Sequence, residues 1–352
     1  MRGKFKMYGE EELHKRPITE LISCMKNLVD GMVYEDIGNR SIYCEINKLK
    51  NISSVSVDPV KSSQFLTALL LVIPVIYDKF TIECTNKPVS STYIDLTMDM
   101  LKKTGINIEQ ENYSAYKIFG KQKYNFLKYN IEGDYSAASY FFALSAISGI
   151  RSEILNLDCL SKQGDKKFIE ILERMGCVVN YKNSCNSIEI LPPEKLRSAG
   201  EIDMSKMQDV VPTAAVAAVF AEGETKIVNI ENLKYKECDR FKAIITELRK
   251  IGARIEYGTD WIKIYGTDDE KKYLPAEIET YKDHRMAMSF SLAALKIPGL
   301  IIKSPECVCK TFPDFYKSFL PLFENIDKEP ENYYSEIYKK ELIKFQNNIN
   351  NK

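Results

Sequence analysis

The sequence predicts an α/β (α+β) protein of two domains, built from repeated βαβαββ units. Three observations lead to this fold class. The chain has 352 residues, which exceeds the usual size of a single hydrophobic core. Amphipathic helices that end at a glycine and lead into a strand recur at an even spacing. Between them lie helices that are apolar on all sides. Such regular recurrence indicates an internal repeat.

The first helix type is predicted within residues 17–34, 93–109, 165–181 and 233–257, and each copy carries an apolar stripe of helical period. The glycines that end these outer helices are Gly31, Gly105, Gly176 and Gly252, which lie 74, 71 and 76 residues apart. Glycine suits a helix C-terminus because it adopts the left-handed conformation without a Cβ penalty. We therefore expect each outer helix to stop at its glycine and to continue into a strand.

The second helix type alternates with the first and is predicted at 65–76, 137–147, 210–221 and 286–295. Its copies open at Ser62, Asp134, Asp209 and Asp283, which lie 72, 75 and 74 residues apart. Ser and Asp at these openings suit N-caps. Because helices that are apolar on all sides belong inside a core, we expect these inner helices to be surrounded by sheets.

Short strands complete each unit. Strands are predicted before the inner helices at 52–57, 129–132, 201–204 and 277–281, and after the glycines at 42–46, 116–119, 188–190 and 262–265. Residues 1–15 are charged and show no pattern, so no inner helix precedes the first outer helix. The repeat therefore predicts a sequence that begins within a unit. We expect an incomplete first domain of about two units at 1–132, a second domain at 133–323 and a polar appendage at 324–352, in which 334–345 has an amphipathic helix pattern.

The composition excludes several classes of protein. Lys plus Arg and Asp plus Glu are both 49, so no net charge recruits nucleic acid or an anionic membrane. The longest apolar run, 65–76, is too short to span a bilayer, and the N-terminus lacks the apolar core of a signal peptide. Nine scattered cysteines without Cys-x-x-Cys spacing indicate a reduced, cytoplasmic compartment with most of them as small core residues. The two histidines, His14 and His284, lack the spacing of a metal site.

Charged residues gather at the boundaries of the predicted elements. Basic residues stand there at Arg16, Lys61, Lys236, Arg240, Arg285 and Lys310. Helix N-termini favour anions, so the pattern indicates a small substrate with several negative charges. Lys236, Glu237 and Arg240 are expected side by side in the first turn of an outer helix. Asp209 and Glu237 are then the carboxylates placed to accept or shuttle a proton. The alternatives are a helix cap for Asp209, an ion-pair partner for Glu237, and solvated surface charge for the basic residues.

Several strings together resemble the family of 5-enolpyruvylshikimate-3-phosphate synthases (3-phosphoshikimate 1-carboxyvinyltransferases), over about residues 12–322. They are Arg16-Pro17-Ile18, Ser62-Ser63-Gln64-Phe65-Leu66-Thr67-Ala68-Leu69-Leu70, Tyr93-Ile94-Asp95, Lys236-Glu237-Cys238-Asp239-Arg240, Asp283-His284-Arg285-Met286-Ala287-Met288 and Lys310-Thr311-Phe312-Pro313-Asp314. The resemblance implies two domains of six repeated units in all, with the active site between them. It also implies enolpyruvyl transfer in the shikimate pathway of aromatic amino acid biosynthesis, with no cofactor and no metal.

The resemblance also assigns roles to residues. Shikimate 3-phosphate would be bound by Ser62, Ser63, Gln64, Ser90, Tyr93, Asn232 and Lys236, and phosphoenolpyruvate by Arg16, Arg240, His284, Arg285 and Lys310. Asp209 would be the base for the attacking hydroxyl, and Glu237 would exchange a proton with the enol carbon. Addition would give a tetrahedral ketal, and loss of phosphate would give the enol ether.

The sequence departs from the family pattern in places. Lys234 stands where the family often has Arg, and Ser91-Thr92 replaces its usual Lys-Pro. The family's early Ser-Lys-Ser helix opening and its Asn-Ala-Gly-Thr loop have no counterpart. Three alternatives therefore stand beside the transferase. One is a transferase that acts on a UDP-sugar. The others are a non-catalytic remnant and one half of a split enzyme, whose N-terminal fragment would be separately encoded.

Overall fold

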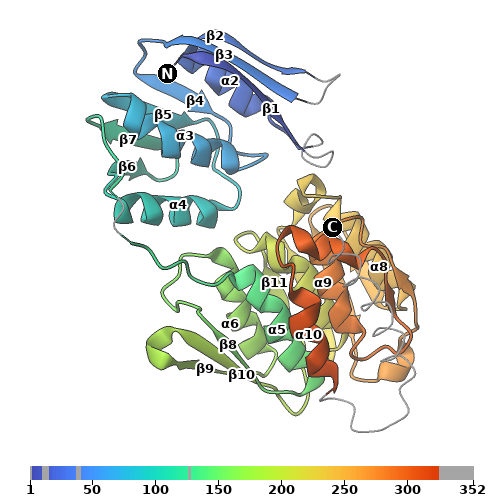
Figure 1. Cartoon of the computed structure of the whole chain (residues 1–352). Helices are drawn as coiled ribbons and strands as arrows, with labels where there is room; N and C mark the ends of the chain where they lie inside the picture. The colour runs from blue at the N-terminus through green and yellow to red at the C-terminus, as the bar shows by residue number, and fades with distance from the viewer. Residues whose placement is uncertain (1, 10–15, 37–40, 126–127, 325–352) are drawn as a thin grey trace. The chain divides into compact units, whose positions relative to one another are not determined.

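The computed structural model describes residues 2–9, 16–36, 41–125 and 128–324 and separates into two compact units (Figure 1). Unit 1 comprises Met1–Ile131, Lys162–Gly164 and Tyr235–Glu237, and unit 2 comprises Glu132–Ser161, Asp165–Lys234 and Cys238–Lys352. Each unit has its own cluster of buried apolar side chains. The structure mixes helices and strands throughout, in agreement with the predicted fold class.

Unit 1 begins with an antiparallel sheet in the order β1-β3-β2. Its strands are β1 (Gly3–Tyr8), β2 (Val29–Asp36) and β3 (Ser41–Leu49), and α2 (Thr19–Leu28) packs against β2. The prediction that the first residues have no pattern was wrong for β1. Lys4 and Lys6 alternate with Phe5 and Met7, which is the period of a strand, and β1 pairs with β3 along its length.

The second sheet of unit 1 has the order β4-β5-β7-β6. It consists of β4 (Ser54–Val57), β5 (Lys79–Cys84), β6 (Ile108–Glu111) and β7 (Ala115–Phe119). The strands β4 and β5 are parallel, so the chain must cross over between them, and α3 (Gln64–Ile76) makes this connection. Leu66, Leu70 and Ile73 of α3 are fully buried. The amphipathic α4 (Ser91–Lys103) packs against α3.

The described part of unit 2 contains three sheets. They are β8-β10-β9, with strands Ser152–Leu155, Ser187–Leu191 and Val178–Lys182, then β11-β12-β14-β13, with strands Glu201–Asp203, Gly223–Val228, Trp261–Gly266 and Arg254–Tyr257, and the short pair β15 (Glu277–Ile278) and β16 (Ile301–Ile302). The outer helices of this unit are α6 (Phe168–Arg174) and α8 (Arg240–Lys250). As predicted, Gly176 and Gly252 follow these helices at positive φ.

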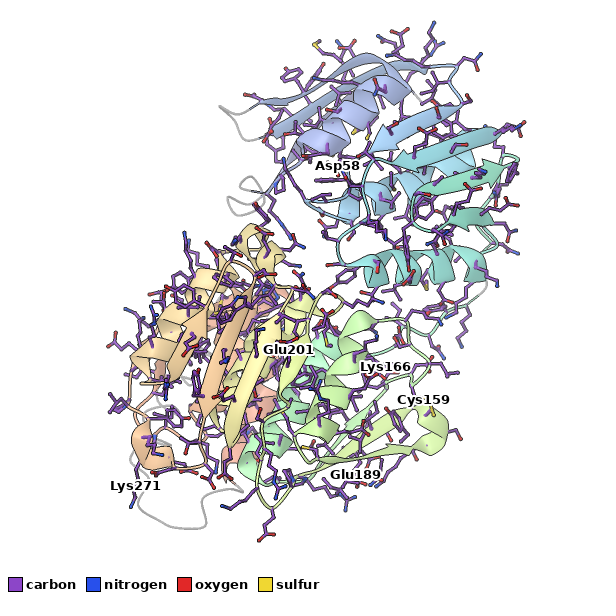
Figure 2. All side chains as sticks on the ribbon, turned by 180° about the vertical axis from the view of Figure 1, so that it is seen from behind. Asp58, Cys159, Lys166, Glu189, Glu201 and Lys271 are labelled. Carbon is purple, nitrogen blue, oxygen red and sulfur yellow. A yellow bond between two sulfur atoms is a disulfide. The ribbon has the colours of Figure 1, made fainter. Side chains whose placement is uncertain are left out.

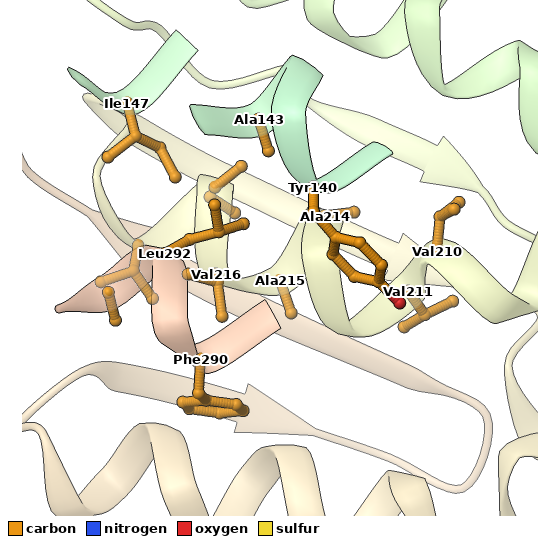
Figure 3. Packing of buried hydrophobic residues seen from close by; sticks show 14 of the residues in the cluster. Tyr140, Ala143, Ile147, Val210, Val211, Ala214, Ala215, Val216, Phe290 and Leu292 are labelled. Atoms are coloured by element: carbon orange, nitrogen blue, oxygen red, sulfur yellow. The ribbon is translucent and has the colours of Figure 1, made fainter. Parts of the chain in front are cut away.

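The centre of unit 2 is formed by α5 (Tyr135–Ser148), α7 (Val211–Val219) and α9 (His284–Ala293), which contact one another. Figure 3 shows apolar side chains from all three helices interlocking. One hydroxyl from each helix joins a buried chain, in which Thr213 Oγ1 lies 3.3 Å from Ser139 Oγ and 3.1 Å from Ser289 Oγ. The structure thus confirms that helices apolar on all sides form the core.

Two predictions near the ends of unit 1 were wrong, one about the end of a helix and one about a strand. The first outer helix ends at Leu28, because Val29 is extended and begins β2. Gly31 lies instead at a bulge within that strand, where a Cβ atom would approach the carbonyl oxygen of Glu45 to 1.8 Å. The strand predicted at 129–132 is also absent from the structure. Ile131 is 81% exposed, and this segment pairs with no strand in the described part of the chain.

The end of unit 2 adds two elements that the repeat did not predict. These are the 3₁₀ helix η6 (Pro305–Lys310) and the helix α10 (Phe315–Glu324). Phe315 of α10 is fully buried and stacks on Phe319 at a centroid distance of 5.0 Å, so α10 belongs to the core. Glu324, the first residue of the appendage predicted at 324–352, is the last residue of α10, and the rest of the appendage lies outside the described residues. No helix among the described residues is long and apolar enough to cross a bilayer.

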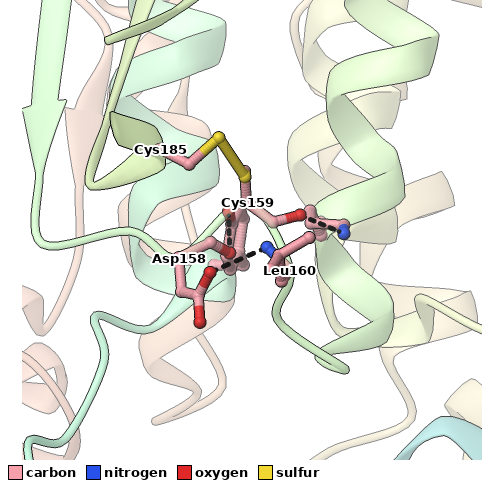
Figure 4. Close-up of a disulfide and its surroundings, with 6 residues drawn as sticks. Asp158, Cys159, Leu160 and Cys185 are labelled. Atoms are coloured by element: carbon pink, nitrogen blue, oxygen red, sulfur yellow. Dashed lines mark hydrogen bonds between the residues drawn. A yellow bond between two sulfur atoms is a disulfide. The ribbon is translucent and has the colours of Figure 1, made fainter. Parts of the chain in front are cut away.

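The cysteines correct another expectation. Cys159 and Cys185 form a disulfide (Figure 4) between the turn that carries Asp158 and the 3₁₀ segment η2 (Asn183–Cys185). Of the remaining seven, only Cys24, Cys44 and Cys177 are buried. Cys84, Cys238 and Cys307 are partly buried and pack against the two core clusters. Six of the nine cysteines therefore lie in or against a core, as predicted, whereas the disulfide departs from the expected reduced state.

Candidate active site

Asp209 lies at the centre of an ion network in unit 2. It sits in the 3₁₀ segment η3 (Gln208–Val210) at the opening of α7. Its Oδ1 accepts a hydrogen bond from Arg240 Nη1 at 2.9 Å, and its Oδ2 accepts one from Arg285 Nη2 at 3.0 Å. The N-cap of α7 is Val210, so the cap predicted as an alternative role is not formed by Asp209. Its carboxylate is instead held by two guanidinium groups, which fix its orientation.

Asp283 completes this network from the start of α9. As the N-cap it accepts the backbone N–H of Arg285 at 2.8 Å. It also accepts Arg240 Nε at 2.7 Å and Arg240 Nη2 at 3.3 Å, so the guanidinium grips it with two nitrogens. Arg240 and Asp283 are 1% and 0% exposed. Such a pair is stable only because each charge is compensated at close range.

His284 follows Asp283 and is also buried, with Nδ1 3.8 Å from the Asp283 carboxylate. Arg285 is less enclosed than Arg240, because 14% of its side chain is exposed. The structure thus brings four predicted site residues to one place, from three different elements of unit 2. They are Asp209, Arg240, His284 and Arg285.

The network influences the pKa of two neighbouring side chains, Asp165 and Tyr140. Burial raises the pKa of Asp165 to about 6, and the charge of Asp209 adds to the rise, while Arg285 and a hydrogen bond from Ser136 oppose it. Burial also raises the pKa of Tyr140 to about 12, against the lowering effect of Arg285 and Arg240. Asp165 was not predicted as part of the site. Its position at the opening of a predicted outer helix was the available signal.

The predicted site residues of unit 1 lie on other elements. Ser63 is the N-cap of α3 and is buried, and Ser62 Oγ accepts the backbone N–H of Gln64 at 3.2 Å. Gln64 and Arg16 line one cavity of about 180 Å³, together with Met7, Tyr8 and residues of α2 and β3. An arginine and an amide facing one cavity can bind an oxyanion.

Ser90 and Tyr93 begin α4. Ser90 is its N-cap and has φ +50, a left-handed conformation that is uncommon outside glycine. Tyr93 follows in the first turn of α4 and is 41% exposed. Lys61, just before α3, pairs with Glu20 at 2.8 Å, which supports the alternative of a surface ion pair for this lysine.

The remaining predicted residues lie in short irregular segments. Asn232 is in the 3₁₀ segment η4 (Glu231–Tyr235), and Lys310 is the exposed last residue of η6, which packs on α9. Lys236 and Glu237 fall in the bend between η4 and α8. The prediction that they share the first turn of the helix with Arg240 was wrong. Asp239 is the N-cap that accepts the N–H of Lys242, so α8 begins only at Arg240.

The model of the EPSP synthase family, 3-phosphoshikimate 1-carboxyvinyltransferase, matches residues 1–319. The chain belongs to the EPSP synthase family. A 3-phosphoshikimate 1-carboxyvinyltransferase of Colwellia psychrerythraea is 39% identical over 315 residues, which cover 89% of this chain and 72% of that protein. The enzyme of the same name from Actinobacillus pleuropneumoniae is 40% identical over 318 residues, 90% of this chain and 72% of that protein.

Solved EPSP synthase structures share the fold. The EPSP synthase from Acinetobacter baumannii has a TM-score of 0.71 at 24% identity, over 90% of this chain and 73% of that chain. The enolpyruvyl transferase NikO from Streptomyces tendae has a TM-score of 0.68 at 16% identity, over 91% and 73%. The resemblance found in the motifs is therefore confirmed, as are the enolpyruvyl transferase fold and the enzyme class. This member of the EPSP synthase family is a transferase of the shikimate pathway.

Proposed function

We propose that the chain transfers the enolpyruvyl group of phosphoenolpyruvate to the 5-hydroxyl of shikimate 3-phosphate and releases phosphate. The observation that carries this proposal is the Asp209 network. A carboxylate held by two guanidinium groups has its oxygens fixed in direction, as a general base requires. The names of the relatives supply the substrate class.

The two arginines of the network, Arg240 and Arg285, have different roles. Arg240 is fully buried and paired with two carboxylates, so it orients Asp209. Arg285 pairs with Asp209 and is partly exposed, so its guanidinium can also bind the phosphate or carboxylate of phosphoenolpyruvate. His284 lies beside it, and Lys310 supplies a further positive charge.

The acceptor is assigned to the remaining polar residues. Shikimate 3-phosphate is bound by Ser62, Ser63, Gln64, Ser90, Tyr93, Asn232 and Lys236. Arg16 is one of the residues that bind phosphoenolpyruvate. Support comes from the open end of α3, where backbone N–H groups and the helix dipole favour an anion. Glu237 exchanges a proton with the enol carbon after Asp209 has activated the hydroxyl. We place the reaction, and the chain, in the cytoplasm.

The test is phosphate release from phosphoenolpyruvate plus shikimate 3-phosphate, with Asp209→Ala as the control. Release should require both substrates and should fall at least about 100-fold in the variant, the usual contribution of a general base. A UDP-sugar acceptor is assayed in parallel. Release with that acceptor instead of shikimate 3-phosphate would overturn the substrate assignment.

We further propose that an N-terminal segment outside this sequence contributes to the active enzyme, either as a separate fragment or joined to this chain. The matches cover 72% of the relatives named above, which supports a contribution from the rest. The unmatched segment of the Colwellia enzyme is added in trans, and phosphate release is expected to rise. No rise would argue against the fragment. No release with or without it, from a folded chain, would overturn the transferase.

A further inference from the structure

A tight turn at Thr280–Asp283 leads into the site. The backbone N–H of Asp283 donates to the carbonyl of Thr280 at 2.8 Å. The two central residues, Tyr281 and Lys282, have φ values of +54 and +56. Positive φ at both central positions is the mark of a type I′ turn, where Asn and Gly are normally found. A tyrosine and a lysine are strained there and persist only where their surroundings hold them.

The turn has a direct structural consequence for the ion network. Its last residue, Asp283, is the N-cap of α9, and His284 and Arg285 are the next two residues. Any shift of the turn therefore moves the residues proposed to bind phosphoenolpyruvate. Strained backbone next to a site is a common way of fixing its side chains.

Glu247 of α8 binds the turn through hydrogen bonds of its side chain. It is a carboxylate with 0% exposure. Its Oε1 accepts the hydroxyl of Tyr281 at 2.7 Å, and its Oε2 accepts the backbone N–H of Glu279 at 3.1 Å. The ammonium of Lys250 balances its charge at 2.7 Å. One carboxylate thus binds both a central residue of the turn and the strand end before it.

The same helix also holds the far end of the turn. Arg240 binds Asp283, and Glu247 lies seven residues later, which is about two turns of helix and hence the same face. The two side chains therefore grip the turn at both ends from one rigid element. Glu247 interrupts the apolar stripe of α8, in which Ile244, Leu248 and Ile251 are all fully buried. Apolar packing therefore does not explain a carboxylate at this position.

We propose that Glu247 is a positioning residue that locks the Thr280–Asp283 turn, and through it His284 and Arg285, for phosphoenolpyruvate. This inference rests on the proposed function for its catalytic consequence. Its structural content, a strained turn fixed by one buried carboxylate, is testable without activity.

The test uses Glu247→Gln in the full chain. Glutamine keeps an acceptor for Tyr281, but its amide group cannot accept the N–H of Glu279 or pair with Lys250. We expect KM for phosphoenolpyruvate to rise on the order of ten-fold, with little change in KM for shikimate 3-phosphate. The matched control is Glu189→Gln. Glu189 is a buried glutamate on β10 (Figure 2) with a lysine partner at 2.7 Å. It lies in the β8-β10-β9 sheet of the same unit.

A rescue distinguishes positioning from a general loss of stability. Lys282→Gly places glycine at φ +56, where it is unstrained, so the turn needs less support. When it is added to Glu247→Gln, Lys282→Gly should lower the raised KM for phosphoenolpyruvate by roughly three-fold or more. The same substitution in the Glu189→Gln background should change KM little. Equal KM effects of Glu247→Gln and Glu189→Gln, or no rescue, would overturn the proposal.

Amide hydrogen exchange gives a result that is independent of activity. Glu247→Gln should lose protection in peptides that cover 279–285, and Glu189→Gln should not. If the native chain releases no phosphate, the proposed function fails, yet this exchange measurement still decides the role of Glu247. Unchanged protection at 279–285 in Glu247→Gln would overturn it.

Discussion

Arg240 is the residue on which the ion network of unit 2 depends. Its guanidinium bonds to both Asp209 and Asp283. Arg240→Ala should lower the free energy of unfolding by about 3–5 kcal/mol, because the buried carboxylate of Asp283 loses the guanidinium that compensates its charge. Urea denaturation measures this loss. Arg285→Ala is the comparison, and it should cost less because 14% of the Arg285 side chain is exposed, against 1% for Arg240. Equal losses would contradict the central position of Arg240.

Asp165 gives the site a pH dependence. Burial is the main cause that raises the pKa of its carboxyl group to about 6 from an ordinary 3.8, and Asp209 is the second. The folded state therefore binds the proton more tightly than the unfolded state. Its contribution to stability is full below about pH 4 and is lost as the pH rises through 6.

Asp165→Asn removes this titration. The free energy of unfolding of the variant, relative to the native chain, should increase by on the order of 1 kcal/mol between pH 4 and pH 7. Urea denaturation at several pH values measures it. Glu189→Gln serves as the control, because partners hold the pKa of Glu189 below its ordinary value, mainly through the hydrogen bond from Lys182. A difference that is flat or falls with pH would argue against a raised pKa for Asp165.

The sequence identified the members of the network more easily than their partners. Asp209, Arg240 and Arg285 each stand at the boundary of a predicted helix, and this position singled them out. Asp283 was interpreted as a cap, and it is one, but a cap pattern does not reveal that the same carboxylate binds a distant arginine. Glu247 carried a signal that was not used, since it interrupts the apolar stripe of α8.

At the scale of elements, the inner helices and most of the strands were predictable, and the short irregular segments were not. The inner helices α5, α7 and α9 were placed within a few residues, because segments of ten or more residues that are almost wholly apolar or small leave no alternative to burial. Lys236 and Glu237 were assigned to α8 because charged residues fit a helix start as well as a bend. Only the side chain of Asp239, which accepts the N–H of Lys242, fixes where the helix begins.

Gly31 shows why a glycine is an ambiguous signal. The residue is required by the close approach of β2 to β3, and it does not end a helix. Gly31→Ala should destabilise unit 1 by about 3 kcal/mol, since the Cβ atom would collide with the backbone of Glu45. Gly120→Ala is the control, because its φ is +74 but no atom lies within 4 Å of the added Cβ. It should cost only about 1 kcal/mol. Similar losses on urea denaturation would count against the bulge.

At the scale of the whole molecule, the repeat determines what meets in the core. The inner helices recur at a nearly constant spacing, and Ser139, Thr213 and Ser289 lie at matching positions, 74 and 76 residues apart. Each repeat therefore contributes one hydroxyl to the point where the three helices of unit 2 meet. The sequence predicted the helices at the centre but not this polar contact, because a lone Ser or Thr in an apolar helix looks like a small filler.

Thr213 is the middle member of this hydroxyl chain, so its loss affects both neighbours. Thr213→Val keeps the shape and should cost about 1–3 kcal/mol, because buried hydroxyls lose a partner. Ser139 also donates to the carbonyl of Ser136 at 2.6 Å, so Ser289 should bear most of the loss. Adding Ser289→Ala to Thr213→Val should then cost clearly less than Ser289→Ala does alone, and a double-mutant cycle of urea denaturation curves measures this coupling. Additive losses would mean that the three helices are held by apolar packing alone and that the shared hydroxyls are incidental to the repeat.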